Sequence, residues 1–204
     1  MFITPFPTFP QWGKENFSPT GGNKKGGITI KAMEFYNLIL SRESIRNYDP
    51  DRQVPKQILE KILNSGRLAP SACNIQPWNF LVVSSPEMLN KVRACYSRDW
   101  FRDAPHILIV VGLKDKAWKR SYDGYNSLET DVAIAMTHLI LAAENEGVAT
   151  CWIEAYNPAV LRESLRLSAD QLVFAITPLG YSKPGFSKSG VKIRKPLEEI
   201  VEYL

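Results

Sequence analysis

The segment from Asn126 to Glu146 constrains the fold most, because it predicts a long helix that is apolar on almost every side. Asn126 can cap this helix, with Glu129 three residues further on, and Gly147 is a residue type that commonly ends one. Such a helix must be buried, either in the middle of the core or in a subunit interface. His138 within it is predicted to be a core histidine with satisfied hydrogen bonds and not a ligand.

Shorter helices and strands alternate around this long helix. The spacing of apolar residues predicts helices over residues 34–40, 55–69, 86–94, 158–165 and 196–204. Short apolar runs predict strands over residues 79–84, 106–113, 150–155 and 172–177, of which the first two are expected to be buried. Helices and strands in this order form a layered α/β or α+β domain.

The length of the chain fits one domain with an additional N-terminal segment. The chain has 204 residues, of which 45% are hydrophobic, and this is enough for one good-sized core. Residues 1–32 are rich in Pro, Phe, Gly and Lys and show no helical or strand period, so we expect an arm there and a folded domain over residues 33–204. The aromatic residues of the arm could dock on a partner, but a loosely held extension is the favoured interpretation.

Charge and cysteine content argue against several classes of protein. The net charge of +4 comes from basic residues spread along the chain, which does not indicate a nucleic-acid partner. Three irregularly spaced cysteines and two histidines predict neither a disulfide framework nor a metal site. The N-terminus does not match a signal peptide, and the apolar runs are too short to cross a membrane. We therefore expect a cytoplasmic protein without metal, nucleic acid or membrane partners.

A stiff, polar stretch over residues 69–80 separates the second predicted helix from the first strand. Pro70 and Pro77 fix the backbone φ angle within it. Such a loop could hold a flat, heteroatom-rich ring, although its composition alone favours an ordinary helix-to-strand turn. Its hydrogen-bonding side chains include Ser71, Asn74 and Gln76.

Four basic residues occur as two pairs, Arg42 with Arg46 and Lys192 with Arg194. If the first pair is helical, its members share a face, and in an extended chain the second pair also shares one. With the neighbouring serines these cations could hold a phosphate dianion through charge-assisted hydrogen bonds. Each pair taken alone is more typical of a solvated surface.

Motifs for other kinds of chemistry are missing from the sequence. No G-x-G-x-x-G follows a predicted strand, and the glycines of residues 180–188 do not have the P-loop order. G-x-S-x-G is absent, and Cys73 has no histidine near it in sequence. We therefore predict no catalytic nucleophile, acid or base among the side chains.

Four stretches resemble motifs of the FMN-dependent nitroreductase family, and they occur in the same order. Residues 41–46 are similar to its N-terminal Arg-Ser-Arg phosphate motif, and residues 69–80 to its Pro-Ser-x-x-Asn-x-Gln-Pro-Trp loop. Residues 147–155 resemble the strand after its central helix, and residues 192–197 its C-terminal basic motif. The resemblance extends from about residue 33 to the C-terminus.

This resemblance implies a fold and an assembly. The fold is α+β, a three-layer sandwich with a mixed, mostly antiparallel central sheet flanked by helices. The assembly is an obligate homodimer whose central helices pack across the interface, with two tightly bound, non-covalent FMN molecules between the subunits.

The resemblance also implies which residues contact FMN. Arg46 approaches the N1/O2 edge of the flavin, and its neighbour Glu43 belongs to the same motif. The phosphate and ribityl chain are bound by Arg42, Ser44, Lys192 and Arg194. The partner subunit contributes Pro70, Ser71, Ala72, Asn74 and Gln76. Backbone amides of Ile153, Glu154 and Ala155 lie near flavin N5.

The implied activity is the reduction of nitroaromatics, quinones or similar electron-poor acceptors by NAD(P)H, in ping-pong hydride transfer through flavin N5. The cofactor carries the chemistry, and the Arg46 guanidinium stabilises the negative charge of reduced flavin. Two alternatives stay open. One is a specialised flavin enzyme of the same fold, such as a reductive dehalogenase or a flavin-consuming enzyme, and the other is a non-catalytic FMN-binding protein.

Overall fold

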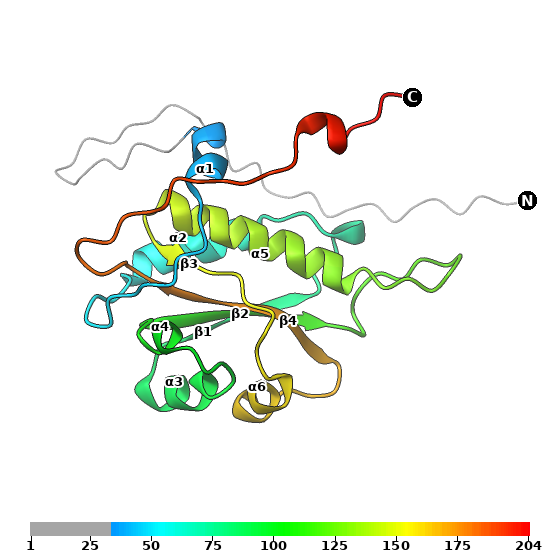
Figure 1. Cartoon of the computed structure of the whole chain (residues 1–204). Helices are drawn as coiled ribbons and strands as arrows, with labels where there is room; N and C mark the ends of the chain where they lie inside the picture. Colours follow the sequence, from blue (N-terminus) through cyan, green and yellow to red (C-terminus); the bar gives the residue numbers. More distant parts are fainter. Residues whose placement is uncertain (1–33) are drawn as a thin grey trace, which may run out of the picture. The chain divides into compact units, whose positions relative to one another are not determined.

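The computed structural model describes residues 34–204, and the predicted arm over residues 1–32 lies outside the described residues. The described part has three layers, with helices on both faces of a central sheet (Figure 1). One face is covered by α2 (Lys56–Arg67) and α5 (Leu128–Asn145). The other face carries α3 (Pro86–Arg93), α4 (Asp99–Arg102) and α6 (Pro158–Leu165). Helix α1 (Phe35–Ser41) packs against α5.

The sheet has four strands among the described residues, in the order β1-β2-β4-β3. They are β1 (Trp78–Val83), β2 (His106–Leu113), β3 (Ala149–Thr150) and β4 (Gln171–Gly180). All three strand pairs are antiparallel, with Phe80 opposite Val110 and Ile109 opposite Ile176. The parallel element is an isolated bridge between Ser44 and Thr150. These features confirm the predicted α+β three-layer fold.

The apolar sequence of β2 follows from its position between two layers of helices. Leu108 and Val110 join the core beneath α2 and α5, whereas Ile107 and Ile109 join the core of α3 and α6. Because side chains alternate between the faces of a strand, covering both faces requires a continuous apolar run. The prediction of a buried strand here is confirmed.

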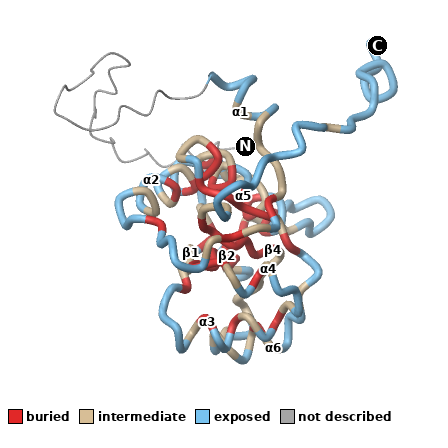
Figure 2. Tube along the Cα trace, turned by 60° about the vertical axis from the view of Figure 1, so that its left-hand side comes forward, coloured by how far each residue is buried: buried red, intermediate tan, exposed pale blue. Residues whose placement is uncertain are grey.

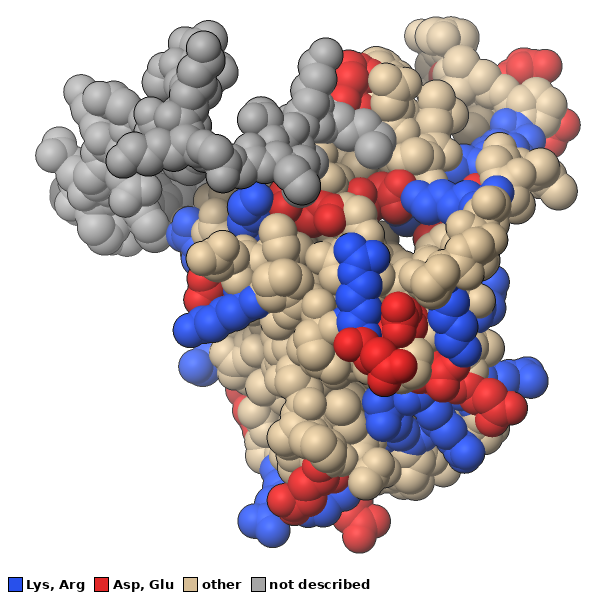
Figure 3. All heavy atoms as spheres, turned by 90° about the vertical axis from the view of Figure 1, so that its left-hand side faces the viewer, with Lys and Arg blue, Asp and Glu red and all other residues tan. Residues whose placement is uncertain are grey.

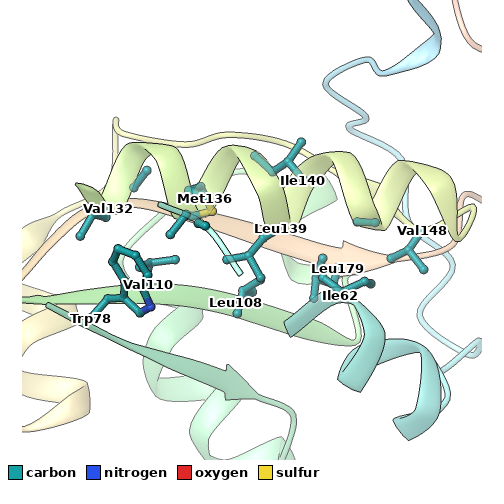
Figure 4. Close-up of a cluster of buried hydrophobic side chains, with 14 of the residues drawn as sticks. Ile62, Trp78, Leu108, Val110, Val132, Met136, Leu139, Ile140, Val148 and Leu179 are labelled. Carbon is teal, nitrogen blue, oxygen red and sulfur yellow. The ribbon is translucent and has the colours of Figure 1, made fainter. Parts of the chain in front are cut away.

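Helix α5 supplies many of the buried side chains in the layer that it forms with α2. Its side chains Val132, Met136 and Leu139 point toward β2, where Leu108 and Val110 meet them (Figure 4). Gly66 of α2 allows the close approach of these helices, because a Cβ atom there would lie 2.7 Å from the Leu139 side chain. The opposite face of α5 is only partly covered and lines a groove of about 640 Å³. His138 lies on this partly exposed face, with Nδ1 3.3 Å from the Ser65 carbonyl oxygen, so it is not the core residue expected.

Two strand predictions need correction, and the start of α5 differs slightly from the expected one. Strand β1 is an edge strand and is only half-buried in its middle, because no strand among the described residues pairs with its outer side. Strand β3 is shorter than expected because the Cys151 amide donates to the Thr177 hydroxyl (3.1 Å) instead of a backbone carbonyl, and pairing resumes at Ile153. Helix α5 begins at Leu128 with Ser127 in the N-cap position, and the expected cap by Asn126 is present, because Asn126 Oδ1 accepts from Leu128 N–H at 3.0 Å.

The predicted C-terminal helix over residues 196–204 is absent. A single 3₁₀ turn, η2 (Leu197–Glu199), forms there, and the apolar side chains around it are exposed. An amphipathic helix of this length depends on packing of its apolar face, and the described residues offer no surface for it. Figure 2 shows the same exposure along α1 and the C-terminal segment, in contrast to the buried centre. No helix between residue 34 and the C-terminus is long and apolar enough to span a bilayer.

Candidate functional site

The predicted phosphate motif is an extended segment, not a helix. Helix α1 ends at Ser41, and Arg42 already has extended φ and ψ angles of −62° and 121°. The segment then runs beside β3, where Ile45 N–H donates to the Thr150 carbonyl oxygen at 2.8 Å. Alternate residues of an extended chain share a face, so Arg42 and Arg46 are brought together by strand geometry instead of helical spacing.

Cys151 lies against this face of the segment. Cys151 is 3% exposed, and burial raises the pKa of its thiol, while the charges of Arg46 and Arg42 and a hydrogen bond from Ser44 lower this pKa in part. Arg42, Ser44 and Arg46 of the motif are therefore all close enough to Cys151 to influence its thiol. The sequence offered no direct signal for Cys151, because a single cysteine in an apolar strand is usually a packing residue.

The C-terminal segment adds two more cations at this place. Burial lowers the pKa of the Lys192 ammonium, and repulsion from Arg42 and Arg194 lowers it further, while attraction to Glu43 and Glu144 raises it in part. No ion pair in the described range includes any of these three residues. Three cations that repel one another form a suitable site for a multiply charged anion, because a phosphate dianion would remove the repulsion.

Two carboxylates hold the C-terminal segment in position. Glu43 accepts hydrogen bonds from the backbone of Ser189 (3.1 Å) and Gly190 (2.7 Å). Burial raises the pKa of Glu43, but these hydrogen bonds outweigh it and leave the pKa below its usual value. Glu144, near the end of α5, accepts a hydrogen bond from Ser41 Oγ (2.7 Å) and pairs with Lys188. The carboxylate of Glu43 is thus engaged in positioning the segment that carries Lys192.

Figure 3 shows the left-hand side of Figure 1, where α5 ends. Basic and acidic side chains are interspersed over this face. The cation cluster of Arg42, Lys192 and Arg194 is therefore a local feature within a surface of mixed charge. Its selectivity for an anion must come from the fixed positions of these residues, since the net charge of the whole chain is only +4.

The polar loop over residues 70–76 has an unusual backbone. Cys73, Asn74 and Gln76 have positive φ angles between 51° and 55°, although none of them is glycine. The loop is braced internally: Gln76 N–H donates to Ser71 Oγ (2.9 Å), and the Gln76 amide group donates to Asn74. Such conformations persist only where the surroundings fix them, and they concentrate at functional sites. This observation favours a function for the loop.

The third predicted stretch, Ile153 to Ala155, continues from Cys151. Ile153 is buried and exchanges backbone hydrogen bonds with Ile176, while Glu154 and Ala155 are exposed. The Glu154 carboxylate accepts a hydrogen bond from Trp152 Nε1 at 2.6 Å. The exposed end of this stretch is therefore fixed by the sheet on one side and by an indole on the other.

The predicted loop and the predicted cations lie at opposite ends of α5. The loop is attached to Asp131 in the first turns of the helix, whereas Ser41, the neighbour of Arg42, is attached to Glu144 in its last turn. These two helix positions are about 20 Å apart at a rise of ~1.5 Å per residue. One chain therefore does not bring the two halves of the predicted site together around a single small cofactor.

A serine–histidine contact elsewhere does not form a catalytic pair. Ser84 Oγ lies 2.7 Å from His106 Nδ1, and the Val54 amide donates to His106 Nε2 at 3.2 Å. Because Nε2 is an acceptor, Nδ1 carries the proton and donates to the serine, so the histidine cannot remove the serine proton. No cluster of metal-ligating side chains occurs within residues 34–204.

Sequence reasoning missed Asp131 and Glu144, which anchor the two halves of the site. A signal was available, because helical spacing places Asp131 beside the core residues Leu128 and Ala135, and Glu144 beside Ile140, at the borders of the buried face of α5. A carboxylate among core positions is rarely tolerated without a dedicated set of hydrogen-bond donors. The short helix α4 also went unpredicted.

The layers and the cation cluster define a class: a three-layer α+β protein with a cluster of basic side chains near the edge strand β3. Comparison with known proteins identifies the family. The family model described as "Nitroreductase family" matches residues 39–96 and 87–181. A putative NADH dehydrogenase/NAD(P)H nitroreductase of Archaeoglobus fulgidus is 36% identical over 154 residues, covering 74% of this chain and 86% of that protein. Human iodotyrosine deiodinase 1 is 26% identical, covering 84% of this chain and 68% of that protein.

Solved structures agree with this assignment. A nitroreductase family protein from Clostridium difficile 630 superposes with a TM-score of 0.77 at 36% identity, covering 84% of this chain and 98% of that one. An FMN-dependent nitroreductase from Clostridium difficile R20291 gives a TM-score of 0.69 at 26% identity, covering 82% and 98%. The chain belongs to the nitroreductase family, and it is therefore an oxidoreductase.

Proposed function

We propose that this protein uses NAD(P)H to reduce nitroaromatics, quinones or similar electron-poor acceptors, by ping-pong hydride transfer through the N5 atom of tightly bound, non-covalent FMN. The observation that carries the proposal is the cluster of Arg42, Lys192 and Arg194, three cations from two distant segments that Lys192 ties together by donating to the Ile39 carbonyl oxygen of α1. A phosphate monoester such as that of FMN matches this cluster in charge and size.

The proposed roles of the side chains follow from their positions. Arg42, Ser44, Lys192 and Arg194 hold the phosphate and ribityl chain. Arg46, further along the same extended face, lies toward N1 and O2, where its fixed guanidinium stabilises negative charge. Bound FMN supplies the hydride chemistry, which explains why no side chain needs to act as nucleophile, acid or base. Of the three backbone amides expected near N5, that of Ile153 donates to the Ile176 carbonyl oxygen at 3.0 Å, so we propose that those of Glu154 and Ala155 face N5.

We propose a homodimer because two copies can complete a site that one copy cannot. Pairing of two α5 helices in opposite directions would bring the loop of one chain, with Pro70, Ser71, Ala72, Asn74 and Gln76, to the cations of the other. The partly exposed face of α5 supports this pairing. Exposed apolar residues of α1 and of the C-terminal segment, such as Leu40 at 64% and Leu197 at 64%, indicate further surface covered by a partner.

We propose that the flavin-binding domain spans residues 33–204. We also propose a cytoplasmic location, which the free cysteines fit.

The direct test is the absorbance spectrum of the purified protein before and after anaerobic addition of NADPH or NADH. We expect flavin bands that bleach with at least one of the two nucleotides and return when an acceptor is added. A colourless protein that takes up no added FMN would contradict the proposal. Bound FMN that neither nucleotide reduces would favour the non-catalytic alternative.

Replacing Arg46 tests the charge assigned to the N1/O2 edge. The Arg46→Ala protein should bind FMN within a few-fold of wild type but reduce it about tenfold to a hundredfold more slowly with NADPH, because losing one charged donor commonly has an effect of this size. Stopped-flow bleaching of the flavin band measures this rate. An unchanged rate would remove Arg46 from its proposed role.

A reductive dehalogenase is the second candidate, because the human deiodinase is among the relatives that match most of this chain. That activity needs a lid with groups specific to the substrate, and residues 114–126 are the candidate segment. They form a small hairpin closed by a bridge between Lys119 and Asn126 and braced by the Arg120–Asp123 ion pair (2.6 Å). Anaerobic turnover of halogenated against nitro substrates separates the two candidates.

A further inference from the structure

Asp131 is a buried carboxylate whose role no part of the proposed mechanism explains. It is 2% exposed, and none of the ion pairs among residues 34–204 includes it. Its Oδ1 accepts a hydrogen bond from the Ala72 amide at 2.9 Å, and its Oδ2 accepts one from Ser127 Oγ at 2.7 Å. A buried carboxylate costs free energy in a core, so its presence at this point indicates a specific task.

The Ala72 amide begins the strained part of the loop. The next two residues, Cys73 and Asn74, both have positive φ angles, as does Gln76. Most of the other hydrogen bonds of the loop are internal, such as those between Ser71 and Gln76 and between Asn74 and Ser71. The hydrogen bond from Ala72 to Asp131 is therefore the contact that ties this strained turn to the rigid core helix. Because α5 is packed in the core, this hydrogen bond fixes the position and orientation of the loop relative to the helix.

We propose that Asp131 is a positioning residue for flavin binding: it holds the loop over residues 70–76 in the conformation that receives the cofactor of the partner subunit. This inference rests on the proposed function. A loop that is already ordered lowers the entropic cost of binding, so loss of the tie should weaken binding of the flavin ring itself. The effect should be the same for FMN and for riboflavin, since the loop is assigned to the ring and not to the phosphate.

Two substitutions remove the tie from opposite sides. Asp131→Ala removes the acceptor, and Ala72→Pro removes the donor while leaving the carboxylate, because proline has no amide hydrogen. Ser71, with φ −145° and ψ 160°, already has the extended conformation that a residue before proline prefers. We expect each variant to raise the Kd of both FMN and riboflavin about tenfold, the usual order for a charge-assisted hydrogen bond. The double variant should be no weaker than the weaker single variant, since both changes remove one interaction.

Asp131→Asn and Glu163→Ala are the controls. The asparagine oxygen can still accept from Ala72, so this variant should bind both flavins within about threefold of wild type. Glu163 is exposed on α6 in the opposite layer, and its loss should change nothing. Amide hydrogen exchange should show faster exchange over residues 71–77 in Asp131→Ala, with α2 and α3 unchanged.

Three results would overturn the inference: unchanged flavin affinity in a folded Asp131→Ala or Ala72→Pro protein, additive losses in the double variant, or exchange over residues 71–77 that does not respond. If Asp131→Ala does not fold, Ala72→Pro with its exchange pattern decides the matter. A wild-type protein that binds no flavin would instead contradict the proposed function, and the exchange measurement would still report whether Asp131 holds the loop.

Discussion

The two ends of α5 solve different problems. Near its C-terminal end, basic side chains from residues 42–46 and 192–194 lie close together. Glu144 and Glu43 hold the segments that carry them. At its N-terminal end, shape is fixed: a loop with positive φ angles at three positions is tied to Asp131 through one backbone amide. One carboxylate of α5 serves each end, and neither carboxylate is part of the proposed contact with the ligand.

This difference teaches how a single helix can serve two half-sites. A cation cluster tolerates some movement, because electrostatic attraction acts over several ångströms, whereas a hydrogen-bonding loop must be placed closely. The charged end is accordingly built from long side chains on exposed segments, and the shaped end from a short loop beside the core. If the ligand is FMN, the cations near the C-terminal end of α5 should bind its phosphate. The loop near the N-terminal end should bind its ring.

The largest effect is expected from Arg42→Ala, which tests the charged end alone. Its removal should weaken FMN binding by about a hundredfold, because a charge-assisted contact with phosphate is lost and a half-buried position is left empty. Riboflavin, which has no phosphate, should bind as in wild type. Titration of the two flavins by fluorescence quenching gives both values, and the FMN value should also weaken with added salt.

Arg102→Ala is the matched control for Arg42→Ala, because Arg102 is exposed on α4 in the opposite layer. It removes the same charge from the protein and should leave both flavin affinities unchanged. An equal loss of FMN and riboflavin affinity in Arg42→Ala would break the division between the two ends and remove the phosphate role.

Much of this fold could be predicted from the sequence, because its signals are local. The two-sided burial of β2 and the apolar faces of α2 and α5 depend on periodicity alone, and α6 has its predicted bounds, Pro158–Leu165. The errors arose where a contact distant in sequence decides the structure. Thr177 shortens β3 by taking a backbone amide, and the C-terminal residues 196–204 have no apolar surface to pack on in one chain.

The candidate site was predictable as a set of residue types but not as an arrangement. Arg42 and Arg46 share a face, but through an extended backbone that pairs with Thr150, a contact over a hundred residues away in sequence. The separation of the loop from the cations could not be deduced without the length and position of α5. Asp131 and Glu144 were overlooked because charged residues on helices are usually exposed, and only the register of the core face marks them as buried.

A smaller effect is expected from Glu144→Gln, the counterpart of the Asp131 substitutions at the charged end. The amide can still accept from Ser41 Oγ, but it loses the ion pair with Lys188, so the C-terminal segment becomes less firmly held. FMN binding should weaken roughly tenfold and stability should fall by about 1 kcal/mol, since Lys188 is partly exposed. Riboflavin binding should not change. Equal losses for both flavins would mean that Glu144 supports the whole helix and not one end.

The smallest effect concerns pH and the segment behind the charged end. Burial lowers the pKa of His106 below its ordinary value of 6.5, and the ring is neutral with Val54 N–H donating to Nε2. The folded protein therefore binds fewer protons than the unfolded chain below pH 6.5. Stability contributed by neutral His106 is fully present above this pH and is lost as the pH falls toward the folded pKa.

Urea unfolding at pH 7.5, 6.5 and 5.5 measures this contribution. We expect the free energy of unfolding of the wild type to fall by roughly 1 kcal/mol more than that of His106→Gln over this range, because the limit is ~1.4 kcal/mol per pH unit for one proton. The difference between the two proteins cancels the titration of the exposed carboxylates. Val54 is followed directly by Pro55 and α2, so acid should loosen the segment over residues 47–55 that continues from the predicted phosphate motif. A wild type whose stability follows that of His106→Gln at every pH would show that His106 is not the acid-sensitive contact of this end.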